Sequence, residues 1–152
     1  MTGKRKTEAK RWFQQAYYDL KATRWNIQGG FYDTACFLAQ QAGEKALKSF
    51  LYFQGARRTA LLTHSLVEMV QEGGKKVDRL TNLLDQAREL DLHYIPSRYP
   101  NGIPSGYPHQ FYGKKVADQA LIAAEKIFST IQDHFRAAGE SEILQVDEEE
   151  KN

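Results

Sequence analysis

The 152-residue chain has one cysteine, four prolines and no long apolar run. With Cys36 as its only cysteine, the chain can form neither an internal disulfide nor a thiolate metal cluster. No stretch is apolar over the roughly 20 residues that a membrane-spanning helix needs. Residues 1–11 are basic but lack the apolar segment of a signal peptide. We therefore expect a cytoplasmic protein with no membrane partner, long enough to bury a core of its own.

The sequence also lacks the alternating apolar and polar residues of a half-buried strand. Apolar residues instead recur every three or four positions, which predicts helices at 6–28, 31–54, 64–71, 76–92 and 114–138. Thr63 is the expected N-cap of the third helix. The turn between the first two helices is short, so these helices should pack antiparallel. The predicted fold is all-α, an up-and-down antiparallel bundle of about five helices formed by residues 1–139.

Proline is absent from every predicted helix and confined to the segment 94–112, "YIPSRYPNGIPSGYPHQFY". The four prolines are Pro96, Pro100, Pro104 and Pro108. They exclude an α-helix across 96–108, and their spacing of four does not match the three-residue turn of polyproline II. The segment therefore predicts an ordered Pro/Tyr-rich loop before the last helix. It is either a rigid connector or a rim that presents Arg98, Tyr99 and His109 to a ligand.

The net charge of +2 conceals an uneven distribution. Residues 140–152 hold six acidic residues and one lysine, whereas the first 139 residues hold 20 lysines and arginines against 13 acidic residues. The acidic segment has little to bury and is predicted to be a disordered tail. The basic body suits an anionic partner such as a nucleotide or RNA, although solvated helix faces would give the same charge.

Charged residues interrupt the apolar faces of the second predicted helix. Glu44 and Lys48 are four residues apart, in the orientation that gives a favourable pair on a helix surface. One interpretation is a solvated surface pair. The other is a polar stripe, together with Gln41, that contacts a partner subunit or a ligand.

Several motifs resemble the HEPN domain family, in its prokaryotic type related to the C-terminal domain of sacsin. They are "WFQQAYYDLKAT", "GGFYDTACFLAQQAGEKALKSFLYFQG", "THSLVEMV" and "SRYP". The match spans residues 8–136, and "AQQAGEKALK" and "RYP" are its most specific parts. The resemblance implies an antiparallel helical bundle that forms a homodimer. Many prokaryotic members are encoded beside a minimal nucleotidyltransferase in toxin–antitoxin-like pairs. Some are metal-independent ribonucleases, and others bind nucleotides without catalysis.

The resemblance also implies which residues bind a ligand. The matching motif positions are Glu44, Lys45 and Lys48 in the second helix, His64 at the start of the next, and Arg98, Tyr99 and Pro100 in "RYP". In a nucleotide- or RNA-binding module, the cations among them would contact phosphate and the rings would contact a base. The protein would then act with a nucleotidyltransferase partner.

The ribonuclease branch of the family carries an arginine followed, after four to six residues, by a histidine. Histidine supplies a general acid or base near neutral pH, and arginine binds the phosphate. Arg57 and Arg58 have this spacing to His64, and Arg88 has it to His93. His93 with Arg88 is the preferred catalytic pair, because it lies nearer the proline loop, and His64 is the second candidate. Arg98 departs from the pattern, because no histidine follows it at this spacing.

No two histidines lie four residues apart on a predicted helix, so we expect neither a metal site nor a cofactor. The sequence leaves three hypotheses: a nucleotide- or RNA-binding module, a metal-independent ribonuclease, and a non-catalytic structural dimer.

Overall fold

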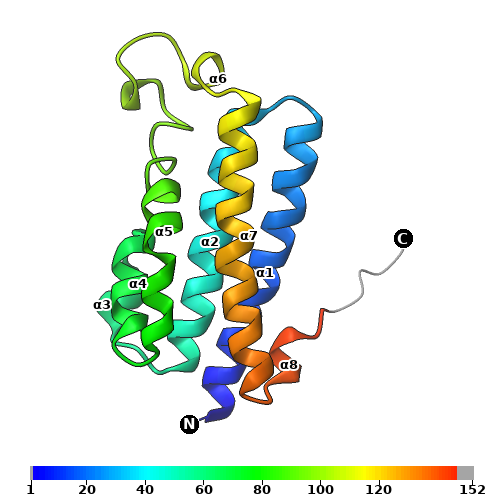
Figure 1. Cartoon of the computed structure of the whole chain (residues 1–152), viewed down its shortest axis with the longest axis vertical. Coiled ribbons are helices and arrows are strands. Elements are labelled where there is room, and N and C mark those ends of the chain that lie inside the picture. Colours follow the sequence, from blue (N-terminus) through cyan, green and yellow to red (C-terminus); the bar gives the residue numbers. More distant parts are fainter. Residues whose placement is uncertain (1, 147–152) are drawn as a thin grey trace.

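In the computed structural model, which describes residues 2–146, the chain is an all-α bundle, as predicted (Figure 1). The first two helices are α1 (Thr2–Gln28) and α2 (Tyr32–Phe53), which run antiparallel. The chain returns along α2 through α5 (Leu84–Asp91), and α7 (Lys114–Ala137) runs back down the bundle. No helix among the described residues is long and apolar enough to cross a membrane.

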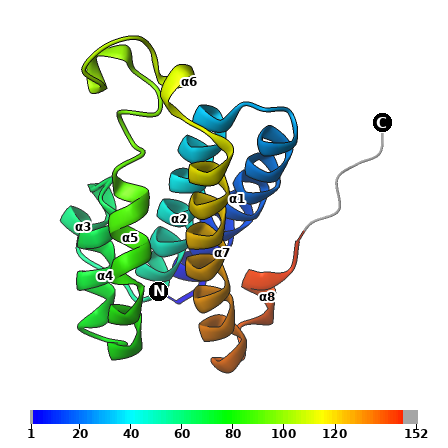
Figure 2. The same cartoon turned by 45° about the horizontal axis from the view of Figure 1, so that its top comes forward.

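Helix α2 lies at the centre, with α1 on one side and α3 (Arg58–Leu62), α4 (Leu66–Gly74) and α5 on the other (Figure 2). Its buried face carries small residues because its neighbours approach closely. Ala35, Ala39, Ala42 and Ala46 are fully buried. At Gly43, an added Cβ atom would lie only 2.7 Å from Leu66 of α4 and 3.0 Å from Leu90 of α5.

The predicted continuous helix over 76–92 is only half right. Its first part is a 3-10 helix, η1 (Asp78–Leu83), and α5 follows directly. The Thr81 hydroxyl donates to the Asp78 carbonyl (2.8 Å), a local bond that competes with regular helix. Leu80 of η1 also packs tightly on Gly73, where an added Cβ would lie 2.9 Å from the leucine. Packing against α4 thus overrides the apolar periodicity here.

Ser65, and not the predicted Thr63, is the N-cap of α4. The Ser65 hydroxyl accepts from the Glu68 backbone N–H (3.2 Å), whereas Thr63 lies at the end of α3. The carboxylate of Asp91 completes the cap, because it accepts from the backbone N–H groups of Leu66 (2.7 Å) and Val67 (3.2 Å). Ser65 and Glu68 have the S-x-x-E spacing of a capping box, which is a local signal. The Asp91 carboxylate comes from the end of α5, so local sequence could not identify its part in the cap.

No α-helix crosses residues 96–107, as the prolines predicted. This stretch contains a single 3-10 turn, η2 (Pro100–Gly102), and folds back on itself so that a Cβ at Gly102 would lie 3.0 Å from Pro96. The short helix α6 (Pro108–Phe111) then starts with a proline, which needs no N–H there. The loop stands at one end of the bundle, above α2 and α7 (Figure 1).

The prediction of a disordered tail from residue 140 does not hold for its first residues. A short helix, α8 (Ser141–Leu144), packs on α1 because Ile143 supplies a side chain that is 1% exposed. The Gln14 amide donates to the carbonyls of Ile143 (3.2 Å) and Gln145 (2.8 Å). Residues 147–152, which hold four of the six acidic residues of the predicted tail, lie outside the described residues.

Candidate functional site

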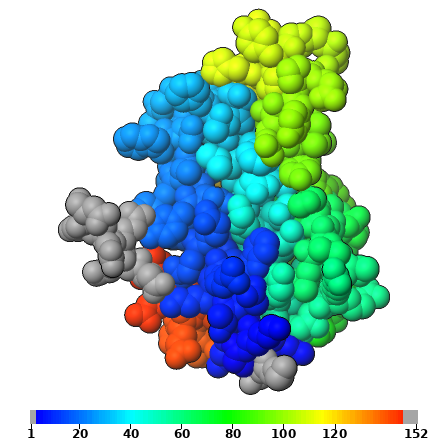
Figure 3. All heavy atoms as spheres, turned by 180° about the vertical axis from the view of Figure 1, so that it is seen from behind, coloured from blue at the N-terminus to red at the C-terminus, as the bar shows by residue number. Residues whose placement is uncertain are grey.

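The polar stripe of α2 lies on the face shown in Figure 3, where α2 reaches the surface between α1 and the segment from α3 to the proline loop. Glu44 and Lys48 form its middle. Their Oε2 and Nζ atoms are 3.2 Å apart, and each residue is only 4% exposed. The interpretation of a solvated surface pair is therefore wrong. Because two buried charges lose their hydration, this pair needs further polar partners around it.

Those partners come first from α2 itself and from the loop before α4. The Gln40 amide donates to Glu44 Oε1 (3.3 Å) and to the His64 carbonyl (3.4 Å). The Nδ1 atom of His64 lies 3.2 Å from Glu44 Oε1, so that the buried carboxylate orients the imidazole. The His64 side chain is itself 56% exposed. Glu44 thus links a buried cation, Lys48, to a histidine that solvent and ligands can reach.

The network continues from Gln40 to α1. The Gln41 amide donates to Gln40 Oε1 (2.8 Å), and Lys45 Nζ donates to Gln41 Oε1 (3.2 Å) and to Asp19 Oδ2 (2.6 Å). Asp19 also accepts from the Gln15 amide (2.9 Å). A single hydrogen-bond network therefore crosses α2 from the His64 loop to α1. Glu44, Lys45 and Gln41 all belong to this network.

Aromatic rings connect His64 to Arg98. The His64 ring stacks on Tyr94, with centroids 5.1 Å apart, and Tyr94 stacks on Phe37 of α2 at 6.4 Å. The Arg98 guanidinium carbon lies 4.2 Å from the Phe37 ring centre and 5.2 Å from that of Tyr99. We call these five residues the His64 face. It presents an exposed histidine and an exposed arginine on one run of rings.

Arg88 and His93, the catalytic pair that the sequence favoured, lie in surroundings different from those of His64. His93 is 8% exposed, with its Nδ1 atom 3.2 Å from the Tyr112 hydroxyl oxygen, and burial lowers the pKa of the imidazole. Arg88 is exposed and pairs with Asp85 (3.1 Å). Arg88 and His93 thus have separate partners, and the buried imidazole is less accessible to an RNA than that of His64. The geometry therefore favours His64 as the histidine of a site.

The other sequence candidates lie outside the His64 face. Arg57 is exposed and pairs with Glu72 (3.3 Å). His109 on α6 is 56% exposed, and its Nδ1 atom lies 2.8 Å from Asp33 at the start of α2. Within residues 2–146, no three His, Cys, Asp or Glu side chains lie close enough together to hold a metal ion.

Sequence reasoning missed Tyr94, Phe37 and Gln40, which hold the site together. Phe37 falls at an apolar position of the second helix, and Tyr94 is one tyrosine of the proline segment. The one available signal was the "RYP" motif, which marked the neighbouring Arg98 and Tyr99. The stacking of Tyr94 between His64 and Phe37 depends on tertiary structure alone.

Comparison with known proteins agrees with this fold. A family model of the HEPN domain matches residues 9–134. The Methanocaldococcus jannaschii protein named "Putative toxin MJ1304" is 27% identical over 135 residues, which is 84% of this chain and 88% of that protein. The crystal structure of TT1696 from Thermus thermophilus is 33% identical, with a TM-score of 0.77, and the match covers 83% of this chain and 97% of TT1696. The archaeal HEPN homologue ST0689 is 32% identical, with a TM-score of 0.67, over 84% of this chain and 97% of its own. The chain belongs to the HEPN domain family, as its motifs predicted.

Proposed function

We propose that the protein is a nucleotide- or RNA-binding HEPN module and the toxin-like member of a pair with a minimal nucleotidyltransferase. Its similarity to the M. jannaschii protein whose name contains "toxin" supports the toxin-like role. The nucleotidyltransferase partner and a homodimer are what membership of this family implies. The ligand would bind at the His64 face.

The observation that carries this proposal is the run of rings from His64 to Arg98. A nucleotide needs a cation for its phosphate and a flat surface for its base, and the His64 face offers both within one short stretch of surface. Arg98 and Tyr99 are exposed, and the guanidinium is held above Phe37 at 4.2 Å. A guanidinium fixed in this way loses little freedom when it binds a phosphate.

The geometry at His64 supports metal-independent RNA cleavage as a second function. With Nδ1 beside the Glu44 carboxylate, the imidazole is oriented and its Nε2 atom is available to exchange a proton with an RNA hydroxyl. Arg98 is the cation of this face that would bind the phosphate. It is connected to His64 by packing, because its guanidinium lies over Phe37, Phe37 stacks on Tyr94, and Tyr94 stacks on His64. In this function His64 would be the acid or base.

Binding of labelled single-stranded RNA and of free nucleotides, measured by fluorescence anisotropy, tests the proposal. Arg98→Ala should weaken binding about tenfold, which corresponds to roughly 1.4 kcal/mol. Arg88→Ala is the matched control, because it removes an exposed arginine that lies outside the His64 face. Equal affinities of the two variants would contradict the proposed site, and no binding by the wild type would contradict the function.

Cleavage of the same RNA in EDTA separates binding from catalysis. Cleavage that is lost in His64→Gln and kept in His93→Gln would make the protein a ribonuclease with His64 as its acid or base. Binding without cleavage would leave a non-catalytic module. For the partner, co-expression with a minimal nucleotidyltransferase should give a complex that co-purifies, and failure to co-purify would contradict that part of the proposal.

A further inference from the structure

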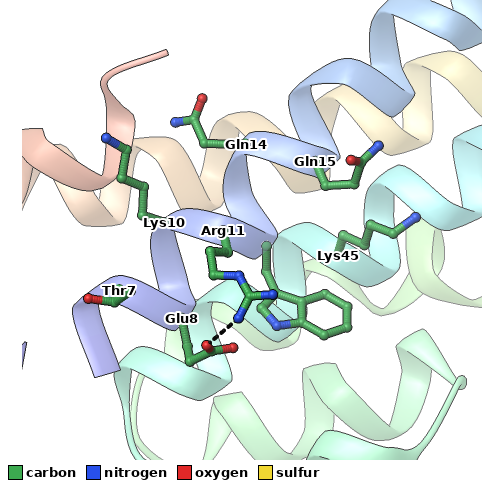
Figure 4. A pocket seen from close by; sticks show the side chains of 8 residues that line it. Thr7, Glu8, Lys10, Arg11, Gln14, Gln15 and Lys45 are labelled. Atoms are coloured by element: carbon green, nitrogen blue, oxygen red, sulfur yellow. Dashed lines mark hydrogen bonds and ion pairs between the residues drawn. The ribbon is translucent and has the colours of Figure 1, made fainter. Parts of the chain in front are cut away.

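Two hollows adjoin on the N-terminal half of α1, beside the polar stripe. The larger, of about 710 Å³, lies between α1 and α2 (Figure 4), and its lining includes Lys10, Arg11, Trp12 and Lys45. The smaller, of about 440 Å³, includes Lys4, Arg5 and Tyr52 in its lining. The rings of Trp12 and Tyr52 stack between the two, with centroids 5.6 Å apart. The hollows therefore form one continuous surface.

This surface is strongly basic. The two linings share Glu8 as their acidic residue, whereas five residues in them are cationic. We call these cations the basic track: Lys4, Arg5, Lys10, Arg11 and Lys45. Arg11 pairs with Glu8 (2.7 Å), but its side chain is 73% exposed, and such an exposed pair holds the arginine only weakly. A polyanion could therefore draw the Arg11 guanidinium away from Glu8.

The basic track is connected to the proposed ligand site. Lys45 belongs both to the lining of the larger hollow and to the hydrogen-bond network that reaches His64. Lys48 lies 5.3 Å from the Trp12 ring centre and pairs with Glu44 on its other side. From Phe37 to Lys45, the member of the basic track on α2, the helix rises by about 12 Å, at 1.5 Å for each residue. One mononucleotide is too short to contact both the basic track and Arg98.

We propose that the basic track binds the phosphate backbone of a single-stranded RNA whose other end occupies the His64 face. The inference rests on the proposed function and narrows it, because the ligand becomes a strand of several nucleotides and not a free nucleotide. Lys4, Arg5 and Arg11 of the basic track are exposed, and Lys10 and Lys45 are half-buried. Cations in such a row suit backbone phosphates, which carry one charge at each nucleotide and do not depend on the base sequence. The basic track sets affinity, and the His64 face binds the base and phosphate at the strand's end.

The test compares oligouridylates of increasing length, from the dinucleotide to the dodecanucleotide, at several salt concentrations. Arg5→Gln/Arg11→Gln should weaken binding of the dodecanucleotide about tenfold at low salt and leave the dinucleotide unaffected. It should also lower the slope of log affinity against log salt by about 0.7 for each phosphate that is no longer neutralised. Lys114→Gln/Lys115→Gln at the start of α7 is the control, because it removes the same charge from two residues that line neither hollow and are not part of the His64 face. Arg98→Ala should weaken binding at every length.

The outcomes distinguish the two proposals. If affinity does not depend on length, or if the Arg5/Arg11 variant behaves like the control, the basic track is not an RNA site while the proposed function stands. If Arg5→Gln/Arg11→Gln instead strengthens RNA binding, the basic track holds an acidic protein segment, which also overturns the inference. If the wild type binds free nucleotides but no RNA of any length, only the inference fails. If it binds neither, both proposals fail together.

Discussion

The regions around His64 and His93 contain the same type of residue in opposite environments. His64 is 56% exposed, beside a buried carboxylate and stacked on a ring, whereas His93 is 8% exposed and faces a phenol. Burial lowers the pKa of His93 and raises the pKa of Tyr112 to about 12, so both groups stay neutral near pH 7. Both histidines follow an arginine at the family spacing, so that spacing does not identify which of them is accessible. Burial and the carboxylate partner do.

Asp91 joins these two regions. It lies two residues before His93, and its carboxylate caps α4, which begins directly after the loop that carries His64. The segment "RELDLH" thus has a structural role at Asp91, whatever the role of its histidine. Substitutions in one region at a time test how each contributes to stability and binding.

The largest effect on stability should come from Glu44, in the His64 region. Glu44→Gln leaves the Lys48 ammonium buried without a counter-charge, which should lower the free energy of unfolding by about 3–5 kcal/mol. Denaturation in urea measures this change. Glu72→Gln is the control, because Glu72 belongs to exposed pairs with Lys75 and Arg57 that contribute little.

A double variant, Glu44→Gln/Lys48→Met, separates the charge effect from a packing effect. Because it removes both buried charges, it should regain most of the stability lost in the single variant. If the double variant is no more stable than Glu44→Gln, the buried charge is not the cause of the loss.

A smaller effect is expected from Asp91, which connects the regions. Asp91→Asn removes the charged cap of α4 and should cost about 1–2 kcal/mol, within the range for N-cap residues. Thermal unfolding measures this, with Asp85→Asn as the control because the Asp85 side chain is 90% exposed. RNA binding should also weaken, because the loop with His64 is held by this cap. A stability loss equal to that of Asp85→Asn would mean that Ser65 alone suffices as the cap.

The long helices α1, α2 and α7 were predictable from the sequence because their cause is local. In α2, the alanines that recur at helical spacing are all buried, so the periodicity correctly indicates the face that packs in the core: Ala35, Ala39, Ala42 and Ala46. The part of Asp91 in the α4 cap was not predictable, since this carboxylate comes from another helix.

The site was predictable only in part, for the same reason. The sequence marked Glu44, Lys48 and His64 through family motifs, and the structure brings these three into one network. It could not show that the Glu44–Lys48 pair is buried, because a salt bridge at this spacing is usually a surface feature. Nor could it show that Tyr94 stacks on His64, thirty positions earlier in the chain. The burial of the pair and the stacking of Tyr94 both depend on contacts between segments that are far apart in the sequence.

The smallest expected effect is a pH dependence that comes from His93. Because burial lowers the pKa of the folded imidazole below its unfolded value, the unfolded chain binds the proton more readily. His93 therefore costs no stability above its unfolded pKa, near 6.5, and it destabilises the fold increasingly as pH falls from there toward the folded pKa. Urea denaturation between neutral and mildly acidic pH should show stability falling with pH, and His93→Gln should make that fall shallower. His134 contributes in the same direction, because burial and Arg79 lower its pKa, so some dependence should persist in the variant. An unchanged slope in His93→Gln would mean that the imidazole is protonated as easily in the folded protein as in the unfolded chain, and the contrast with His64 would then rest on accessibility alone.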